Sequence, residues 1–266
     1  MPPLPNRDFH FFPVPDVPVN LPSLTLTNTT TWTYCGPLLP LSDSNPPSSS
    51  EPEGFPETFH SWSSHTFSGE FALLPRLTPF LRAVHAFLLQ HGTHHYWLTV
   101  RASKPTADFN APRWHTDDHF FDPPRSDEAR GQWKLCGTLQ GPGTLFAEDG
   151  AKARRKRPHV CTVVGCAACG RTSEAVREEV RVALEGEGVV QPGNGEMAFF
   201  RLGGREGAVH SEPRIECDRV FVNVVPGTEA ELRGLMGRWG MEFPRSWSLG
   251  VPAVVGMTGC KELDAL

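Results

Sequence analysis

Short strand-like segments separated by glycine and proline restrict the fold of this chain more than any other feature. In the second half of the chain, β-branched, aromatic and aliphatic residues recur in short runs that end at turn residues. Such a series is typical of a sandwich or barrel. We therefore expect a mainly β fold with flanking helices. The expected strands are 95–103, 113–121, 132–140, 144–149, 195–203, 207–213 and 219–227.

Three segments have helical rather than strand periodicity. Apolar residues follow helical spacing from Leu77 within 73–92, and Gly92 is placed to end that helix. Residues 173–188 form an amphipathic pattern, and residues 228–240 form a shorter one. Between 132–140 and 144–149 the sequence Gly-Pro-Gly predicts a hairpin turn.

Proline and serine dominate the first 56 residues, where no sustained periodicity is visible. We interpret 1–56 as an N-terminal arm whose aromatic residues favour partial docking. A length of 266 residues then suits one domain over 57–266. We expect a cysteine-rich and helical insertion at 150–190 within that domain.

Composition excludes several classes of function. A formal net charge of −5 argues against a nucleic-acid surface. No apolar run is long enough to span a membrane, and the first residues lack a basic start and an apolar segment. The seven cysteines then indicate reduced thiols. We expect a cytoplasmic monomer or homodimer that acts on a small molecule.

The stretch PRWHTDDHFF, residues 112–121, carries the first chemical signal. If it is a strand, His115 and Asp117 point to the same face, about 7 Å apart. Two ligands at that spacing can reach one metal ion, and a third must come from elsewhere. His210, at the end of the apolar segment GAVH, is the best candidate. Two imidazoles and one carboxylate form the facial triad of non-haem Fe(II) oxygenases.

An arginine follows the distal histidine in the segment RVFVNVV. On a strand, Arg219, Phe221 and Asn223 share one face. A guanidinium at the start of that strand is suited to bidentate binding of a carboxylate, where lysine would serve less well.

These residues, in this order, resemble the Fe(II)/2-oxoglutarate-dependent oxygenase superfamily over residues 95 to 226. The resemblance implies a double-stranded β-helix, also called a jelly roll. It also implies Fe(II) on His115, Asp117 and His210, with Arg219 binding the co-substrate 2-oxoglutarate. O2 would decarboxylate 2-oxoglutarate to succinate while a substrate C–H bond is oxidised. Many members carry serine two residues after this arginine, where this chain has Phe221, so the binding geometry of the arginine departs from the common pattern.

The segment WKLCGTLQGPGTLF (133–146) is similar to small members of the superfamily. Among them, a fungal amino-acid-oxidising group that makes an aziridine from valine is the nearest. That similarity implies a small substrate such as an amino acid, and hydroxylation, desaturation or ring closure as the outcome.

Alternation in 132–140 places Lys134, Cys136 and Thr138 on one face. If that face points inward, Lys134 or Thr138 contacts a bound carboxylate. If it points outward, the same residues form an ordinary solvated strand face.

Ordinary structural roles compete with each of these assignments. His115 and Asp117 could be a polar strand pair, and His210 a surface histidine beside a turn. His119 shares the expected metal-facing side and is a competing ligand. Arg219 could pair with Asp218 or Glu216 at a strand edge, which leaves Arg214 as the alternative carboxylate-binding residue.

A cysteine segment, HVCTVVGCAACG, gives the main alternative function. His159 with Cys161, Cys166 and Cys169 could hold a structural zinc ion, although the apolar neighbours favour cysteine as a small hydrophobic residue. A zinc-stabilised binding protein with a basic loop would then replace the enzyme. A third hypothesis keeps the barrel and the metal but not 2-oxoglutarate, as in cupin-type oxygenases.

Overall fold

A computed structural model describes residues 8–18, 20–41, 54–69, 73–121, 132–155 and 173–251 of the chain. Its strands are β1 (Phe9–Pro13), β2 (Thr30–Pro37), β3 (His95–Ser103), β4 (Trp133–Gln140), β5 (Leu145–Ala147), β6 (Val189–Val190), β7 (Glu196–Arg201), β8 (His210–Ser211), β9 (Arg219–Gly227) and β10 (Arg245–Leu249). Its helices are α1 (Glu57–Thr66), α2 (Leu74–Gln90), α3 (Ala151–Arg154), α4 (Ser173–Ala183) and α5 (Glu229–Arg238), with a 3-10 turn at Ala107–Phe109.

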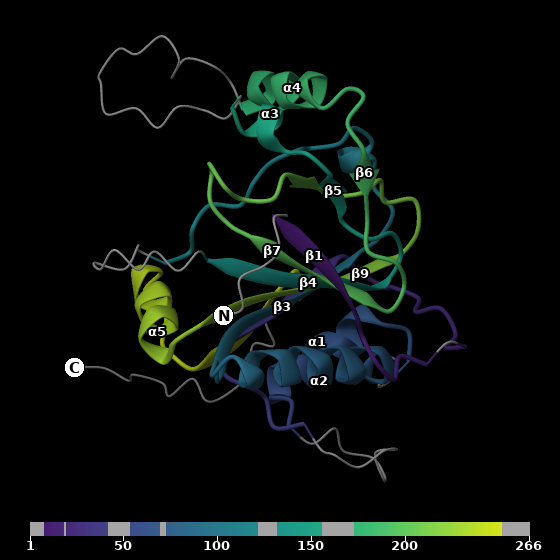
Figure 1. Cartoon of the computed structure of the whole chain (residues 1–266). Helices are drawn as coiled ribbons and strands as arrows, with labels where there is room; N and C mark the ends of the chain where they lie inside the picture. The colour runs from purple at the N-terminus through teal and green to yellow at the C-terminus, as the bar shows by residue number, and fades with distance from the viewer. Residues whose placement is uncertain are drawn as a thin grey trace, which may run out of the picture.

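Two antiparallel sheets form the body of the molecule (Figure 1). The larger has the order β1-β7-β4-β9-β3-β2-β10, and the smaller has the order β6-β5-β8. A bridge between His115 and His210 adds the segment around residue 115 to the edge of the smaller sheet. From β3 onward, the chain passes repeatedly from one sheet to the other. This strand order is that of a double-stranded β-helix, and it confirms the predicted jelly roll.

One face of the larger sheet packs against α1 and α2, which lie on the side opposite the smaller sheet (Figure 1). Val220, Val222 and Val224 alternate along β9 toward this layer. Helix α2 meets them with an apolar stripe at helical spacing, and Gly92 ends the helix in a left-handed conformation, as predicted. Each large side chain buried in this layer contributes about 1.5–3 kcal/mol to stability. The buried residues of α2 are Leu77, Phe80, Leu81, Val84 and Leu88.

The hairpin predicted from Gly-Pro-Gly is wrong. Strand β4 pairs with β7 and β9, whereas β5 pairs with β6 and β8 in the other sheet. Gly141 has a φ of +86°, and the turn sends the chain across the jelly roll rather than back along β4. The predicted strand 113–121 is also shorter than expected, because its pairing is confined to the bridge at His115.

Residues before 57 contribute strands that have no clear sequence periodicity. Strand β1 pairs with β7 and β2 pairs with β3, so this part of the chain extends the larger sheet at both sides. Trp32 on β2 is fully buried and packs against Phe59 and Trp62 of α1. Helix α1 and strand β10 were likewise not expected from the sequence. Within the described residues, no helix has the length and apolar character needed to cross a membrane.

Packing of α2 on β4 depends on a glycine. A Cβ atom added at Gly137 would lie 2.3 Å from Cε2 of Phe80, which is 2% exposed and held by the core. We predict that Gly137→Ala lowers the free energy of unfolding by about 1–3 kcal/mol, because the core cannot absorb the added methyl group without shifting. Urea denaturation measures this change.

The matched control is Gly234→Ala in α5, where an added Cβ meets nothing within 4 Å. It should raise the free energy of unfolding by about 0.5–1 kcal/mol through helix propensity alone. Equal effects of the two substitutions would contradict the close packing between α2 and β4.

Candidate active site

Two histidines are brought together by the backbone. The amide of His115 donates to the carbonyl oxygen of His210 at 2.9 Å, and the amide of His210 donates to that of His115 at 2.9 Å. Their ring centroids are 4.4 Å apart. The pair therefore joins a segment after β3 to strand β8, and its geometry does not depend on side-chain conformation alone.

Each imidazole is held in one tautomer by a backbone carbonyl. Nδ1 of His115 lies 2.7 Å from the oxygen of Arg113, and Nδ1 of His210 lies 3.0 Å from the oxygen of Ala208. A carbonyl oxygen only accepts, so in the neutral ring Nδ1 carries the proton and Nε2 keeps its lone pair. Histidines that bind a metal are commonly oriented in this way.

Asp117 completes a group of three donors. Nε2 of His115 is 3.7 Å from its Oδ1, and Nε2 of His210 is 3.7 Å from its Oδ2. The three ligand atoms lie within 4.8 Å of one another, as a metal site requires. Donors about 2 Å from one ion at right angles lie about 3 Å apart, so small side-chain movements suffice. Two neutral imidazoles and one carboxylate suit Fe(II).

Burial and neighbouring charges set the pKa values of two of these donors. Burial alone would raise the pKa of Asp117, but Lys134 and the two histidines outweigh it and lower that pKa to about 2. Burial lowers the pKa of His210 to about 4, against the opposing effect of Asp117. At neutral pH the site therefore presents an ionised carboxylate and a neutral imidazole, which are the protonation states that a metal requires.

Lys134 lies beside the three-donor group. Its Nζ is 2.7 Å from Oδ2 of Asp117 and lies 5.7 Å from the ring centroid of Phe200. The face of β4 that carries Lys134, Cys136 and Thr138 thus points inward, between the two sheets. The opposite face, with Leu135, packs into the helix layer.

Arg219 lies further along the same inner surface, at the start of β9. It is 3% exposed, and burial lowers its pKa to about 10, so it stays charged at neutral pH. Nε donates to the oxygen of Pro142 at 2.9 Å, and Nη2 lies 3.5 Å from Oγ1 of Thr138. The guanidinium also lies 4.7 Å from the ring centroid of Phe221. The expected alternative, an ion pair with Asp218 or Glu216 at a strand edge, is not formed.

Cys136 lies on this inner surface between Lys134, beside the three-donor group, and Thr138, beside Arg219. It lies between Lys134 and Thr138 on β4 and is fully buried. Burial raises the pKa of its thiol to about 11, and the charges of both Lys134 and Arg219 act to lower it. Asp117, Lys134 and Arg219 therefore all lie within electrostatic reach of this thiol.

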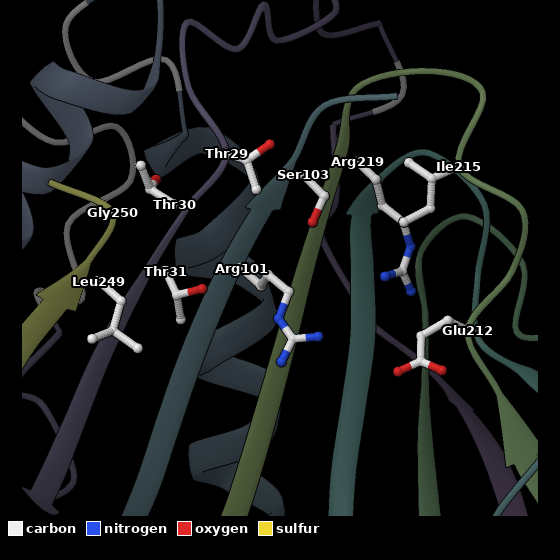
Figure 2. Close-up of a pocket in the computed structure, with 10 residues that line it drawn as sticks. All are labelled: Thr29, Thr30, Thr31, Arg101, Ser103, Glu212, Ile215, Arg219, Leu249 and Gly250. Carbon is white, nitrogen blue, oxygen red and sulfur yellow. The ribbon is translucent and has the colours of Figure 1, made fainter. Parts of the chain in front are cut away.

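A cavity of about 320 Å³ opens beside Arg219 (Figure 2). That volume is at the lower end of small-molecule sites. Figure 2 shows the guanidinium groups of Arg101 on β3 and Arg219 on β9 extending from their strands in the same direction. Glu212, two residues after His210, also lines the cavity. The remaining lining residues are Thr29, Thr30, Thr31, Ser103, Ile215, Leu249 and Gly250.

The competing candidates lie elsewhere. His119 is exposed and is not part of the three-donor group. Arg214 is exposed, and its Nε lies 3.0 Å from Oε1 of Glu216. Cys161, Cys166 and Cys169 lie outside the described residues. Arg101 and Glu212 were missed from the sequence, although the alternation of β3 places Arg101 on the same face as Thr99 and Ser103.

No family model and no curated protein matches the sequence. Among solved structures, the chain is similar to viral collagen prolyl hydroxylase from Paramecium Bursaria Chlorella virus-1, with 13% identity over 57% of this chain and 67% of that chain and a TM-score of 0.30. It is also similar to SnoK, a non-haem alpha-ketoglutarate-dependent carbocyclase from nogalamycin biosynthesis (15% identity, 56% and 60% covered, TM-score 0.33). A third is a Pseudomonas putida prolyl-4-hydroxylase (15% identity, 57% and 62% covered, TM-score 0.27).

The strand order is that of a jelly roll, and two histidines with one aspartate converge between its sheets. Two imidazoles and one carboxylate form a facial triad, a donor set that suits Fe(II) and leaves coordination positions open.

We predict that His115→Ala weakens Fe(II) binding by about 100-fold or more, because one of three direct donors is lost and even supporting residues of metal sites contribute 10–100-fold. Anaerobic titration of the metal-free protein with Fe(II), with metal content measured after gel filtration, tests this.

The matched control is His119→Ala, which removes an exposed histidine four residues away. It should bind Fe(II) as the unmodified protein does. If both variants bind Fe(II) equally well, the three-donor group is not the metal site.

Proposed function

We propose that the protein is an Fe(II)/2-oxoglutarate-dependent oxygenase that oxidises a C–H bond of a small molecule. The observation that carries the proposal is the pairing of two features on one inner surface. Three metal donors meet within 4.8 Å, and a buried, charged arginine follows the distal histidine by nine residues.

His115, Asp117 and His210 would hold Fe(II) through Nε2, a carboxylate oxygen and Nε2. The carbonyl oxygens of Arg113 and Ala208 keep both rings in the tautomer that this requires. Lys134 fixes one oxygen of Asp117 and compensates its charge. When bound, Fe(II) with O2 and 2-oxoglutarate supplies the oxidation, in which 2-oxoglutarate is converted to succinate and carbon dioxide.

Arg219 would bind the distal carboxylate of 2-oxoglutarate, with Thr138 beside it. Two of its five N–H groups are directed at Pro142 and Thr138, which fix the plane of the guanidinium and leave the others for a ligand. Glu212 lines the same cavity and its charge acts to raise the pKa of Arg219, but within the described residues no ion pair joins the two side chains. The positive charge of Arg219 therefore stays available for an anion.

The side chain of Asn223 favours a bound ligand in the space between the three metal donors and Arg219. It lies on β9 opposite Cys136 of β4, and its Oδ1 is buried without a hydrogen-bond partner among the described residues. A buried amide oxygen of this kind costs about 1–3 kcal/mol unless a partner satisfies it. A bound molecule with an N–H or O–H group would supply that partner.

The proposal includes a small substrate, such as an amino acid, and hydroxylation or oxidative cyclisation as the outcome. Ring closure of valine to an aziridine is one such cyclisation. The volume of the cavity beside Arg219 supports a small rather than a polymeric substrate.

We predict that Arg219→Lys raises the Kd for 2-oxoglutarate about 10-fold or more, because an ammonium replaces a planar fork that binds a carboxylate bidentately. The measurement is an anaerobic titration of the Fe(II) protein with 2-oxoglutarate, followed by the weak visible charge-transfer band. Fe(II) affinity should change little, because Arg219 is not one of the three donors.

Arg214→Lys is the control, since Arg214 is exposed and pairs with Glu216. Its Kd for 2-oxoglutarate should match that of the unmodified protein. An Fe(II) protein that shows no band, or that releases no succinate from 2-oxoglutarate, would favour a cupin-type oxygenase instead.

A further inference from the structure

We infer that Arg101 and Glu212 form the substrate site, and that they bind the carboxylate and the ammonium group of an α-amino acid. This inference rests on the proposed function and specifies its substrate. Two arginines, Arg101 and Arg219, line one cavity, whereas binding of the co-substrate carboxylate requires only one of them.

The two arginines differ in their surroundings. Arg219 is buried and has hydrogen bonds to Pro142 and Thr138. Arg101 is exposed, and no hydrogen bond or ion pair holds its guanidinium within the part of the chain that the structure describes. The co-substrate therefore has a prearranged partner in Arg219, whereas Arg101 keeps all five N–H groups free for a second anion.

The strand register places Arg101 next to the position proposed for the co-substrate, but not at that position. Arg101 on β3 is opposite Phe221 on β9 and Thr31 on β2. Arg219 is opposite Ser103 instead, two residues further along β3. Arg101 thus lies one strand further than Arg219 from β4, the strand that carries Thr138.

Groups around Arg101 suit a small zwitterion. The hydroxyl groups of Thr31 and Ser103 line the cavity and can donate to a carboxylate. Ile215 and Leu249 offer apolar surface for a side chain. Glu212 supplies the only carboxylate among the cavity-lining residues.

Charge balance assigns Glu212 to the ammonium group. With two arginines and one glutamate, the lining residues carry a net charge of +1. A substrate with a carboxylate alone would place a second anion beside Glu212 with no cation added, which is unfavourable in a partly buried site. An α-amino acid satisfies both groups.

The test combines two measurements on the full chain loaded with Fe(II). The first is succinate release from 2-oxoglutarate with each proteinogenic L-amino acid as probe, compared with the matching primary amide. The second is the Kd for 2-oxoglutarate, from the anaerobic titration above. Both are repeated on Arg101→Gln, on Glu212→Gln and on Arg245→Gln, a matched control that removes an exposed arginine of β10 outside the cavity.

We expect at least one amino acid to stimulate succinate release about 10-fold, and its amide to fail. Arg101→Gln should raise the KM for that amino acid about 30-fold or more, as expected for loss of one partner of a charge pair. Its Kd for 2-oxoglutarate should change less than about two-fold. Glu212→Gln should also raise the KM for the amino acid, while Arg245→Gln should not.

Three results would overturn the inference while the proposed function stands. They are a Kd for 2-oxoglutarate that rises with Arg101→Gln, equal stimulation by acid and amide, and no stimulation by any amino acid. If the unmodified protein shows neither the visible band nor succinate release, the proposed function itself fails and this inference fails with it.

Discussion

The reciprocal pair of backbone hydrogen bonds between His115 and His210 is the constraint on which the site depends. It joins two segments that are distant in the sequence at the edge of the smaller sheet. Backbone bonds of this kind fix the positions of both Cα atoms, and the two ring centroids lie 4.4 Å apart. Asp117 then needs only the two-residue spacing from His115 to reach both imidazoles.

Burial of charge around this pair is tolerated because each charged group has a compensating partner. Asp117 would be costly between two sheets, but Lys134 is 2.7 Å from it and compensates its charge. Arg219 is compensated differently, by a carbonyl oxygen, a hydroxyl group and the face of Phe221. None of these three partners carries a formal charge, so the positive charge of Arg219 remains for a ligand.

The sequence predicted the strands that carry strong alternation and missed those that do not. Strands β3 and β9 were predicted with the bounds that the structure has, because their apolar residues alternate toward a helix layer. Strands β1, β2 and β10 contain proline, threonine and serine, and they are held by pairing with neighbouring strands rather than by a pattern of their own. The hairpin predicted after β4 is wrong for a related reason. A local turn signal does not specify which of the two sheets the next strand joins.

For the site, the sequence supplied the residue types but not the cavity. His115, Asp117, His210 and Arg219 were singled out by motif and order, and these are residues that the fold brings to one inner surface. Arg101 and Glu212 belong to no motif. The proximity of Arg101 to Arg219 follows from strand register across β3 and β9, whereas Glu212 reaches the cavity from the segment after β8. A shift of one residue in that register would turn Arg101 toward the helix layer and Val100 toward the cavity. The same alternation that buries the valines of β9 therefore determines which charges face the ligand.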